Sequence, residues 1–170
     1  AIDMPQEYVD RLAADTNLTL VTHIVATLQE RIEWERRKVL LVGYSPEATQ
    51  SHLRQKAPMG YVVKPGTVYL GHELAVDRKV GEKIEVPVVG SEKPKTFEVA
   101  MIIPEQGSKE DISIIMHLSD AQEVLNKPGK VNQIMAINCH CGEAEMPIIR
   151  QQLEKALPEA RVTEFRTKFL

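Results

Sequence analysis

The first part of the chain combines a short amphipathic segment with two long apolar runs. Asp3, followed by a proline and a glutamine, resembles a capping box and predicts a helix over residues 5–14. Residues 18–28 and 39–44 are rich in Leu, Val, Ile and Thr, which favours strands. The apolar positions between them fit both helical and alternating spacing. We favour one long hairpin, with Trp34 as a packing residue.

Glycine and proline divide the middle of the chain into short segments. Ser45, with a proline after it, predicts a helix that ends near residue 56. Across residues 61–104, β-rich runs alternate with Gly and Pro. We expect one helical turn over residues 73–78 and a hairpin of residues 83–89 and 96–103. These patterns predict a small, mostly β lobe.

The C-terminal third alternates strands with helices. Residues 112–118 form a nearly continuous apolar run, which is typical of a buried strand. Ser119 begins a second capping box and predicts a helix that ends near residue 127. The remaining predicted elements are a strand over 131–139, a helix over 145–157 with Ile149, Leu153 and Leu157 on its buried face, and a strand over 161–165.

The predicted order is a helix, long strands, a β-rich insert, and then strand, helix, strand, helix and strand. Strands that alternate with single helices are typical of a split β-α-β layer. We therefore predict an α+β fold in which a ferredoxin-like lobe is interrupted by a small, mostly β second lobe. Residues 1–60 and 109–170 would form the first lobe and residues 61–108 the inserted one. The pattern shows no strand before the first helix, although this layout requires one.

The composition is that of an ordinary soluble globular domain. Apolar residues make up 43% and charged residues 26% of the chain. The formal net charge is -3 with both signs interspersed, so nucleic acid and anionic membrane surfaces are poor partners. No window reaches the roughly 18 consecutive apolar residues of a membrane-spanning helix, and no signal peptide opens the chain. We interpret the 170 residues as an excised or processed segment.

One longer signature lies in residues 66–126. It contains GTVYLGHELA, then VGEKIEV, FEVAMII and finally DISIIMHLSDAQEVLN. This stretch resembles the core of the extracytoplasmic (periplasmic core) domain of MacB-, LolC- and FtsX-type ABC transporter permeases. The resemblance implies a porter-like lobe interrupted by a mostly β lobe, located between the first and second transmembrane helices of the permease.

The residue roles that the resemblance implies are all structural. They are three turn glycines (Gly66, Gly71 and Gly81), the acidic residue of a Gly-Asp/Glu turn (Glu82), and the ends of a strand-to-helix signature (Asp111 and Gln122). None of these roles is chemical. The resemblance therefore implies no catalytic residue and no enzyme activity.

The function that the resemblance implies is the coupling of cytoplasmic ATP hydrolysis to efflux, lipoprotein release or activation of a cell-wall hydrolase. No cofactor is expected in this domain, because a separate nucleotide-binding subunit or domain handles ATP. The implied partners are the transmembrane part of the same permease, the ATPase, a second permease subunit, and a periplasmic adaptor or lipoprotein. The implied location is the extracytoplasmic side of the cell membrane. We expect the lobes to move about junctions near residues 44–61 and 104–110.

The only concentrated group of reactive residues in the sequence is Cys139, His140 and Cys141. Thiolates and imidazole bind zinc or copper(I), and another histidine could extend the set. The usual tight spacing is Cys-x-x-Cys, so this pair is half a metal site at best, and a disulfide between them would close a strained ring. We favour structural or incidental thiols. The alternative is a metal-binding or thiol-redox module centred on Cys139 and Cys141.

The other polar residues show no catalytic pattern. The histidines, which we expect to be surface or satisfied core residues, are His23, His52, His72 and His117. The acidic residues that we expect to be solvated are Glu47, Glu73, Glu105, Glu110 and Asp111. Ser45 and Ser119 are expected helix caps, and no phosphate-binding loop occurs. A free-standing small-ligand-binding protein is a third hypothesis.

Overall fold

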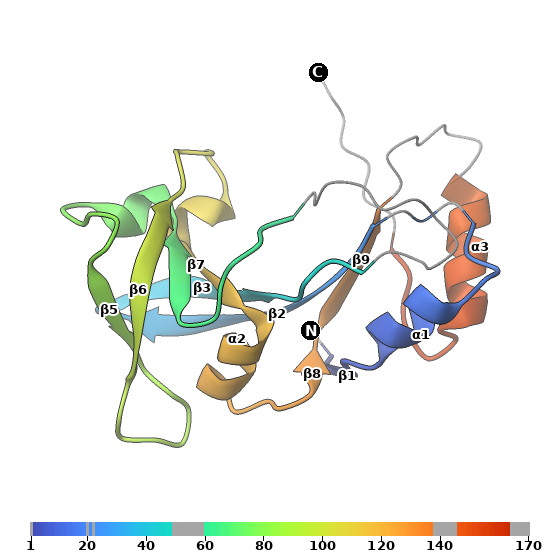
Figure 1. The fold of residues 1–170 in the computed structure, drawn as a ribbon, viewed down its shortest axis with the longest axis horizontal. Helices are drawn as coiled ribbons and strands as arrows, with labels where there is room; N and C mark the ends of the chain where they lie inside the picture. The colour runs from blue at the N-terminus through green and yellow to red at the C-terminus, as the bar shows by residue number, and fades with distance from the viewer. Residues whose placement is uncertain (1, 20, 22, 49–59, 138–145, 164–170) are drawn as a thin grey trace.

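Seven strands form one mixed sheet (Figure 1). The computed structural model describes residues 2–19, 21, 23–48, 60–137 and 146–163. The order of the strands across the sheet is β5-β6-β4-β7-β3-β2-β9. Their bounds are His23–Trp34 for β2, Arg37–Tyr44 for β3, Thr67–Leu70 for β4, Lys83–Val86 for β5, Lys95–Ile102 for β6, Ser113–His117 for β7 and Gln133–Ile137 for β9.

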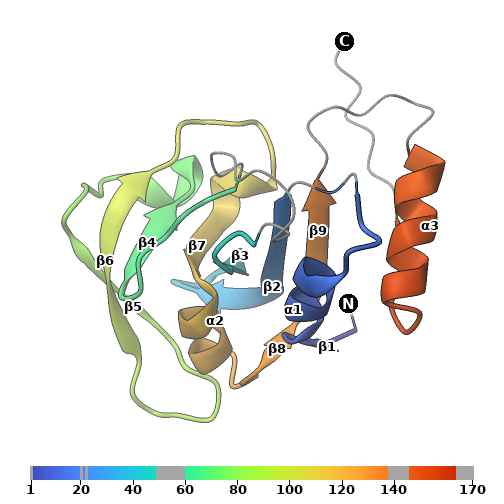
Figure 2. The ribbon, with the colours of Figure 1, turned by 45° about the vertical axis from the view of Figure 1, so that its right-hand side comes forward.

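Helices and a second, two-stranded sheet complete the described fold. The helices are α1 (Tyr8–Ala14), α2 (Leu118–Val124) and α3 (Met146–Ala156), with the 3₁₀ turns η1 (His72–Ala75) and η2 (Lys109–Ile112). The small sheet pairs β1 (Met4–Pro5) with β8 (Lys130–Val131). α1 and α3 lie at one end of the molecule, and β5 and β6 at the other (Figure 1 and Figure 2). The predicted α+β class is confirmed. None of the described helices could cross a membrane.

The predicted long hairpin is confirmed, and its turn lies at Glu35 and Arg36. β2 and β3 pair antiparallel up to this turn, where the two residues have φ of 50° and 64°. Positive φ at both positions is typical of a type I′ hairpin turn. Trp34 is 4% exposed and its Nε1 donates to the Glu85 carbonyl at 2.8 Å, which confirms its packing role. β2 begins at His23, later than predicted, where its pairing with β9 starts.

The helices cover one face of the sheet and build the main core there. Successive side chains of a strand point to opposite faces. In β7, Ile114 belongs to the main core and Ile115 to a smaller cluster on the other side, which we call the open face. Gly43 allows α2 to pack closely, because a Cβ there would lie 2.3 Å from the Ala121 Cβ. Among the described residues, the buried core of the open face is formed by Val42, Val63, Ile103 and Ile115.

The predicted inserted lobe supplies β4, β5 and β6, which continue the same sheet. β4 pairs antiparallel with β7, and β7 pairs parallel with β3. β5 and β6 form the predicted hairpin, with Lys83 opposite Glu98 and Val86 opposite Lys95. η1 takes the place of the predicted helical turn. The lobe boundaries at residues 60 and 108 remain predictions.

The first helix begins at Tyr8 and not at Pro5. β1 pairs with β8 and so removes its two residues from the helix. The N-cap is Glu7, which makes no side-chain capping bond. Asp3, the predicted cap, instead forms an ion pair with Lys127 at 3.0 Å. β1 is therefore a short strand before the first helix, which the sequence pattern did not show.

Two other predicted elements are wrong over their described residues. Ser45 does not begin a helix: its Oγ accepts the Ala26 N–H at 2.8 Å, and Ala48 forms a bridge with Ile24. Pairing with β2 satisfies these backbone groups and keeps the segment extended. The remainder of that predicted helix lies outside the described residues. The predicted last strand has no regular secondary structure at residues 161–163, and its other residues also lie outside the described part.

α2 starts with a different cap from the one predicted. His117 is the N-cap, and its Nδ1 accepts the Ser119 N–H at 3.1 Å. Ser119 is therefore the capped residue and not the cap. Gln122 Nε2 donates to the Lys130 carbonyl at 2.9 Å and so connects α2 to β8.

α3 closely matches the helix predicted for residues 145–157. Ile149 and Leu157 are each 5% exposed, and Leu153 packs partly buried against the same core. The predicted buried face of this helix is confirmed. An apolar stripe at helical spacing can be read from the sequence because it packs against whatever surface the sheet offers.

Candidate functional site

An extended segment, residues 60–66, follows the open face of the sheet, and we call it the crossing segment. Val63 in its middle is 4% exposed and belongs to the small core of that face. Carboxylates hold both ends. Glu47 accepts the N–H of its first residue at 2.6 Å, and Asp120 accepts the N–H of its last residue at 2.8 Å. The segment is thus attached at three points along its length.

Three tyrosines and a glutamate meet beside the crossing segment. We call this group the tyrosine junction, and its members are Tyr44, Tyr61, Tyr69 and Glu110. The Tyr61 ring lies edge-on to Tyr44, with centroids 5.5 Å apart and 77° between the planes, and to Tyr69, with values of 6.0 Å and 84°. Edge-to-face pairs are favourable because a positive ring edge meets a negative ring face. The junction joins β3, the crossing segment, β4 and η2.

A hydrogen bond connects the two predicted junction segments. The Tyr61 hydroxyl donates to Glu110 Oε2 at 2.7 Å, so residues 44–61 and 104–110 are in contact. Burial raises the pKa of the Tyr61 phenol above its usual range, and the hydrogen bond to Glu110 raises it further. Burial and the charge of Glu110 also raise the pKa of Tyr44. Both phenols therefore stay protonated well above neutral pH.

The linker after β6 is folded around Asp111. Its carboxylate accepts the N–H of Gln106 at 2.8 Å and that of Gly107 at 2.9 Å. Asp111 is 6% exposed, so the prediction that it is a solvated surface charge is wrong. The buried carboxylate is stabilised by the donors that it receives. This turn holds the neighbouring Glu110 in place beside the crossing segment.

The three predicted turn glycines are needed for two different reasons. Gly66 and Gly81 have φ of 82° and 95°, a region that glycine adopts without strain. Gly71 has φ of -63°, and its requirement is space, because a Cβ there would lie 2.1 Å from the Glu110 carbonyl oxygen. Glu82, beside Gly81, is exposed.

Asp120 holds the crossing segment to α2 and β6, and sequence reasoning missed it. It is 5% exposed, and its Oδ1 accepts from Lys95 Nζ at 3.0 Å while Oδ2 accepts the Gly66 N–H. Burial lowers the pKa of Lys95, but hydrogen bonds to Glu123 and Asp120 outweigh this and raise it. The partners of Asp120 lie 25 and 54 residues away, so no local pattern indicates them.

A buried histidine and glutamate lie next to the crossing segment. His23 Nδ1 is 2.9 Å from Glu47 Oε2, and the two side chains are 1% and 9% exposed. Over the described residues, the buried His23 Nε2 has no hydrogen-bond partner. His23 is a core histidine, as predicted, and its Nδ1 is paired, whereas the prediction of a solvated Glu47 is wrong. Glu73 and Glu105 are exposed, as predicted.

The predicted reactive cluster cannot be placed in this fold. Cys139, His140 and Cys141 lie outside the described residues, and so does His52. Over the ranges that the structure describes, no three His, Cys, Asp or Glu side chains come close enough to hold a metal ion. His72 is exposed in η1.

The fold is similar to that of extracytoplasmic domains of ABC-type transporters. The extracellular domain of the ABC-type transporter YknZ from Gram-positive bacteria matches with a TM-score of 0.62, 9% identity, and coverage of 92% of this chain and 83% of that chain. The periplasmic region of MacB from Actinobacillus actinomycetemcomitans matches with a TM-score of 0.55 and 8% identity, and the match covers 89% of this chain and 73% of that chain. No protein-family model and no curated protein sequence matches the chain. The predicted resemblance is confirmed at the level of the fold.

Proposed function

We propose that this chain is a non-catalytic extracytoplasmic domain of an ABC transporter permease. It couples cytoplasmic ATP hydrolysis to efflux, lipoprotein release or activation of a cell-wall hydrolase. Its partners are the transmembrane part of the same permease, an ABC ATPase, a second permease subunit, and an adaptor or lipoprotein outside the membrane. The observation that carries this proposal is the likeness of the fold to the YknZ domain over 92% of the chain.

The arrangement of the ends of the molecule supports the proposal. Arg11 in α1 donates to the Ala156 carbonyl of α3 at 3.2 Å and pairs with Glu159 at 3.4 Å. A domain inserted between two membrane-spanning helices needs its entry and exit elements close together. We therefore place the end with α1 and α3 toward the membrane, and the end with β5 and β6 away from it (Figure 1).

Within this domain, the tyrosine junction is the contact that adjusts when the permease moves. A displacement of residues 104–110 carries Glu110 with it, and through the Tyr61 hydroxyl it acts on the crossing segment. Opening the junction costs about 1 kcal/mol for the hydrogen bond and about 1 kcal/mol for each aromatic contact. The main core stays intact, so the change is a small one of the hinge type.

The proposal is tested on the full-length protein in its own membrane. We expect an ABC ATPase to co-purify with it after detergent extraction, and the complex to hydrolyse ATP. A variant of the ATPase that lacks its phosphate-binding lysine controls for contaminating activity. Recovery of the protein from the soluble fraction without an ATPase would overturn the proposal.

One observation favours the second candidate function, a metal-binding or thiol-redox module centred on Cys139 and Cys141. His23 has a carboxylate at Nδ1 and, over the described residues, no partner at Nε2. Metal-ligating histidines usually have their second nitrogen oriented by a carboxylate in this way. The β9 partner of His23 is Ile137, which precedes Cys139 by two positions in the sequence.

Metal analysis and thiol titration separate the two functions. A metal module holds about one zinc or copper(I) ion per chain, and we expect Cys139→Ser and His23→Gln both to lose it. His72→Gln changes an exposed histidine and serves as the control. Metal-free protein, with two freely titrating thiols in the wild type and His23→Gln and one in Cys139→Ser, contradicts this function.

A further inference from the structure

The edge of β5 lies beside the tip of the β2/β3 hairpin, with a hollow between them that we call the edge hollow. β5 is the last strand on its side of the seven-stranded sheet, and Figure 1 shows the hairpin tip next to it. The hollow has a volume of about 460 Å³, and its lining includes Glu33 and Trp34 of β2 and residues 83–85 of β5. The Trp34 Nε1 donates to the Glu85 carbonyl at 2.8 Å and so connects the two strands. The two edges are therefore close together, although they do not pair as strands.

The backbone of β5 has unpaired groups on its outer edge. In an antiparallel pair, residues that exchange hydrogen bonds with the partner strand alternate with residues whose N–H and C=O point away from it. Lys83 and Glu98 form a pair of the second kind, because the Glu98 N–H donates at 3.1 Å to the Gly66 carbonyl on the other side of β6. Lys83 and Glu85 therefore direct their backbone groups away from β6. Of these groups, only the Glu85 carbonyl has a partner among the described residues.

The outer edge of β2 follows the same rule. Thr27 and Gln29 direct their backbone groups to this edge, because the Thr27 carbonyl accepts the Asn132 N–H at 3.0 Å and the Gln29 N–H donates to Asn132 Oδ1 at 2.9 Å. Glu33 is an even number of residues farther along and directs its N–H and C=O to the same edge. The pairing of β2 with β9 stops at Thr27, so no described strand covers Glu33. The edge hollow thus lies between two strand edges that have free donors and acceptors.

The side chains that line the edge hollow differ between its inner and outer sides. Ile84 and Trp34 are 3% and 4% exposed and belong to the main core. Glu33, Lys83 and Glu85 alternate with these residues along their strands and are exposed. The inner side of the hollow is therefore apolar and the outer side is charged.

The outer side carries a small excess of negative charge. Arg78 also lines the hollow, but Glu35 pairs with it, and its guanidinium lies 4.8 Å from the centre of the Trp34 ring. The two glutamates of the outer side and Lys83 make no ion pair within the described ranges. Two carboxylates and one amine are thus available to a ligand.

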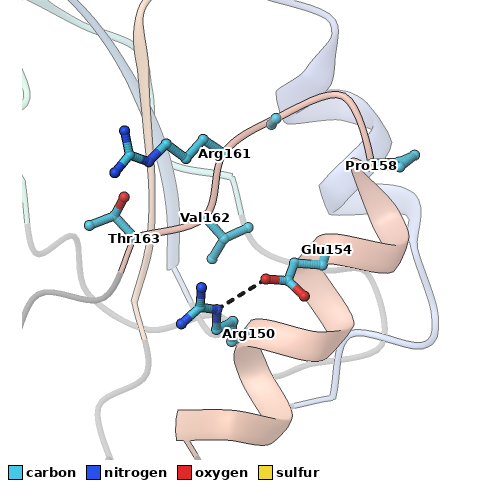
Figure 3. A pocket seen from close by; sticks show the side chains of 7 residues that line it. Arg150, Glu154, Pro158, Arg161, Val162 and Thr163 are labelled. Carbon is cyan, nitrogen blue, oxygen red and sulfur yellow. Dashed lines mark hydrogen bonds and ion pairs between the residues drawn. The ribbon is translucent and has the colours of Figure 1, made fainter.

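The hollow beside α3 differs from the edge hollow in this respect. Arg150 already pairs with Glu154 at 3.0 Å, and Figure 3 shows Arg161 extending away from both. Its charged residues therefore define no common position for a ligand.

We propose that the edge hollow binds an extended peptide segment of a partner protein, which adds to β5 as a further strand. The backbone of this segment pairs with the free groups of Lys83, Glu85 and Glu33, as in strand addition to a sheet edge. Its inward residues are apolar, because they meet Ile84 and Trp34. Its outward residues include a basic one, because opposite charges on neighbouring strands attract and the outer side is acidic. This site depends on the two strand edges and not on the proposed function.

The test titrates the purified 170-residue chain with a capped peptide of sequence VKVTV while the fluorescence of Trp34 is followed. Trp34 is the only tryptophan of the chain and lines the hollow, so its emission should change on binding. One control peptide is VEVTV. The other is VKVTV with alternate amides N-methylated, which removes backbone donors and keeps every side chain.

Two variants of Lys83 separate the backbone of β5 from its charge. Lys83→Pro removes an outward N–H that the pairing with β6 does not use, and proline is tolerated at such positions of edge strands. Lys83→Gln removes only the charge and is the matched control.

We expect the N-methylated peptide to bind at least tenfold more weakly than VKVTV, because it loses two or more hydrogen bonds. VEVTV should bind about threefold more weakly. Lys83→Pro should bind VKVTV about fivefold more weakly, as for the loss of one hydrogen bond, and Lys83→Gln at least as tightly as the wild type.

Equal affinity for the plain and the N-methylated peptide, or no change in fluorescence with any peptide, overturns the site. Both results are obtained on the wild type and so hold even where Lys83→Pro does not fold. An equal loss of affinity in Lys83→Pro and Lys83→Gln overturns the role of the backbone. None of these results affects co-purification with an ATPase, so the proposed function is judged separately.

Discussion

The two faces of the sheet differ in what holds them together. On the face covered by helices, α1, α2 and α3 share one large apolar core with the strands. On the open face the buried core has four members among the described residues, and carboxylates hold the crossing segment through Glu47, Glu110 and Asp120. Burial of a large apolar surface is non-directional and hard to lose in part. A few directed polar contacts can be released one at a time, so the open face is where the molecule can change shape at low cost.

The largest expected effect on stability comes from two neighbouring residues of β7, one on each face of the sheet. Ile114→Ala removes a side chain from the main core, and we expect a loss of about 4 kcal/mol in the free energy of unfolding. Ile115→Ala acts on the open face, where the smaller cluster can collapse into the space, and the expected loss is about 2 kcal/mol. Urea unfolding of both variants measures the difference. Equal losses would contradict the distinction between the two faces.

Asp120→Asn tests the polar attachment of the crossing segment. The amide that replaces one carboxylate oxygen cannot accept, so either the Gly66 N–H or Lys95 loses its acceptor. We expect a loss of about 2 kcal/mol in the free energy of unfolding, together with faster amide exchange in the crossing segment. Asp77→Asn at an exposed position is the control and should have no effect. Unchanged exchange in the crossing segment of Asp120→Asn would count against its role.

Tyr61→Phe tests the tyrosine junction while keeping the ring. The loss of the hydrogen bond to Glu110 should cost about 1 kcal/mol of stability. Tyr8→Phe is the control, because the Tyr8 hydroxyl has no hydrogen bond to any described residue. Its ring instead lies under the Arg11 guanidinium.

The same variant predicts a change in the pH dependence of stability. The pKa of Tyr61 is raised in the folded state from a usual value of 10.0, so the folded state holds this proton more tightly. Its contribution is complete below pH 10 and decreases as the pH rises above that value. Thermal unfolding from neutral to alkaline pH should show a steeper loss in the wild type than in Tyr61→Phe. A matching slope in both proteins would exclude the junction as its cause.

Glu73→Gln should have the smallest effect. Glu73 pairs with Arg37 at 3.1 Å, but the side chains are 55% and 43% exposed. Water and salt screen such a pair, so we expect a change below about 0.5 kcal/mol in the free energy of unfolding. A loss as large as that of Asp120→Asn would show that surface ion pairs, and not the open face, hold the inserted strands.

Elements with a strong local pattern could be predicted from the sequence. The β5/β6 hairpin is bounded by turn residues, β7 is a continuous apolar run, and α3 has an apolar stripe at helical spacing. Each of these signals is complete within a few residues. Helix caps were harder to predict, because a serine hydroxyl can bind a distant backbone group instead of capping the helix that follows it. Ser45 binds the Ala26 N–H of a distant strand, and His117 takes the place of Ser119 as the cap of α2.

The candidate site could be predicted only in part. Both junction segments were expected from the change in composition, but not the contact between them. Tyr61 and Glu110 are 49 residues apart, and the parallel and antiparallel pairing of β7 brings them together. Asp120 resembled an ordinary residue of a helix start. Such contacts depend on how distant strands pair in the fold, and the local spacing of residues does not indicate that pairing.

Exposure of this domain outside the membrane is tested most directly by labelling the full-length protein in intact spheroplasts. Glu92→Cys places a thiol on the exposed loop between β5 and β6, in a background where Cys139 and Cys141 are serine. The background without Glu92→Cys is the control. We predict that a membrane-impermeant maleimide labels Glu92→Cys before lysis. Labelling only after lysis would contradict an extracytoplasmic domain.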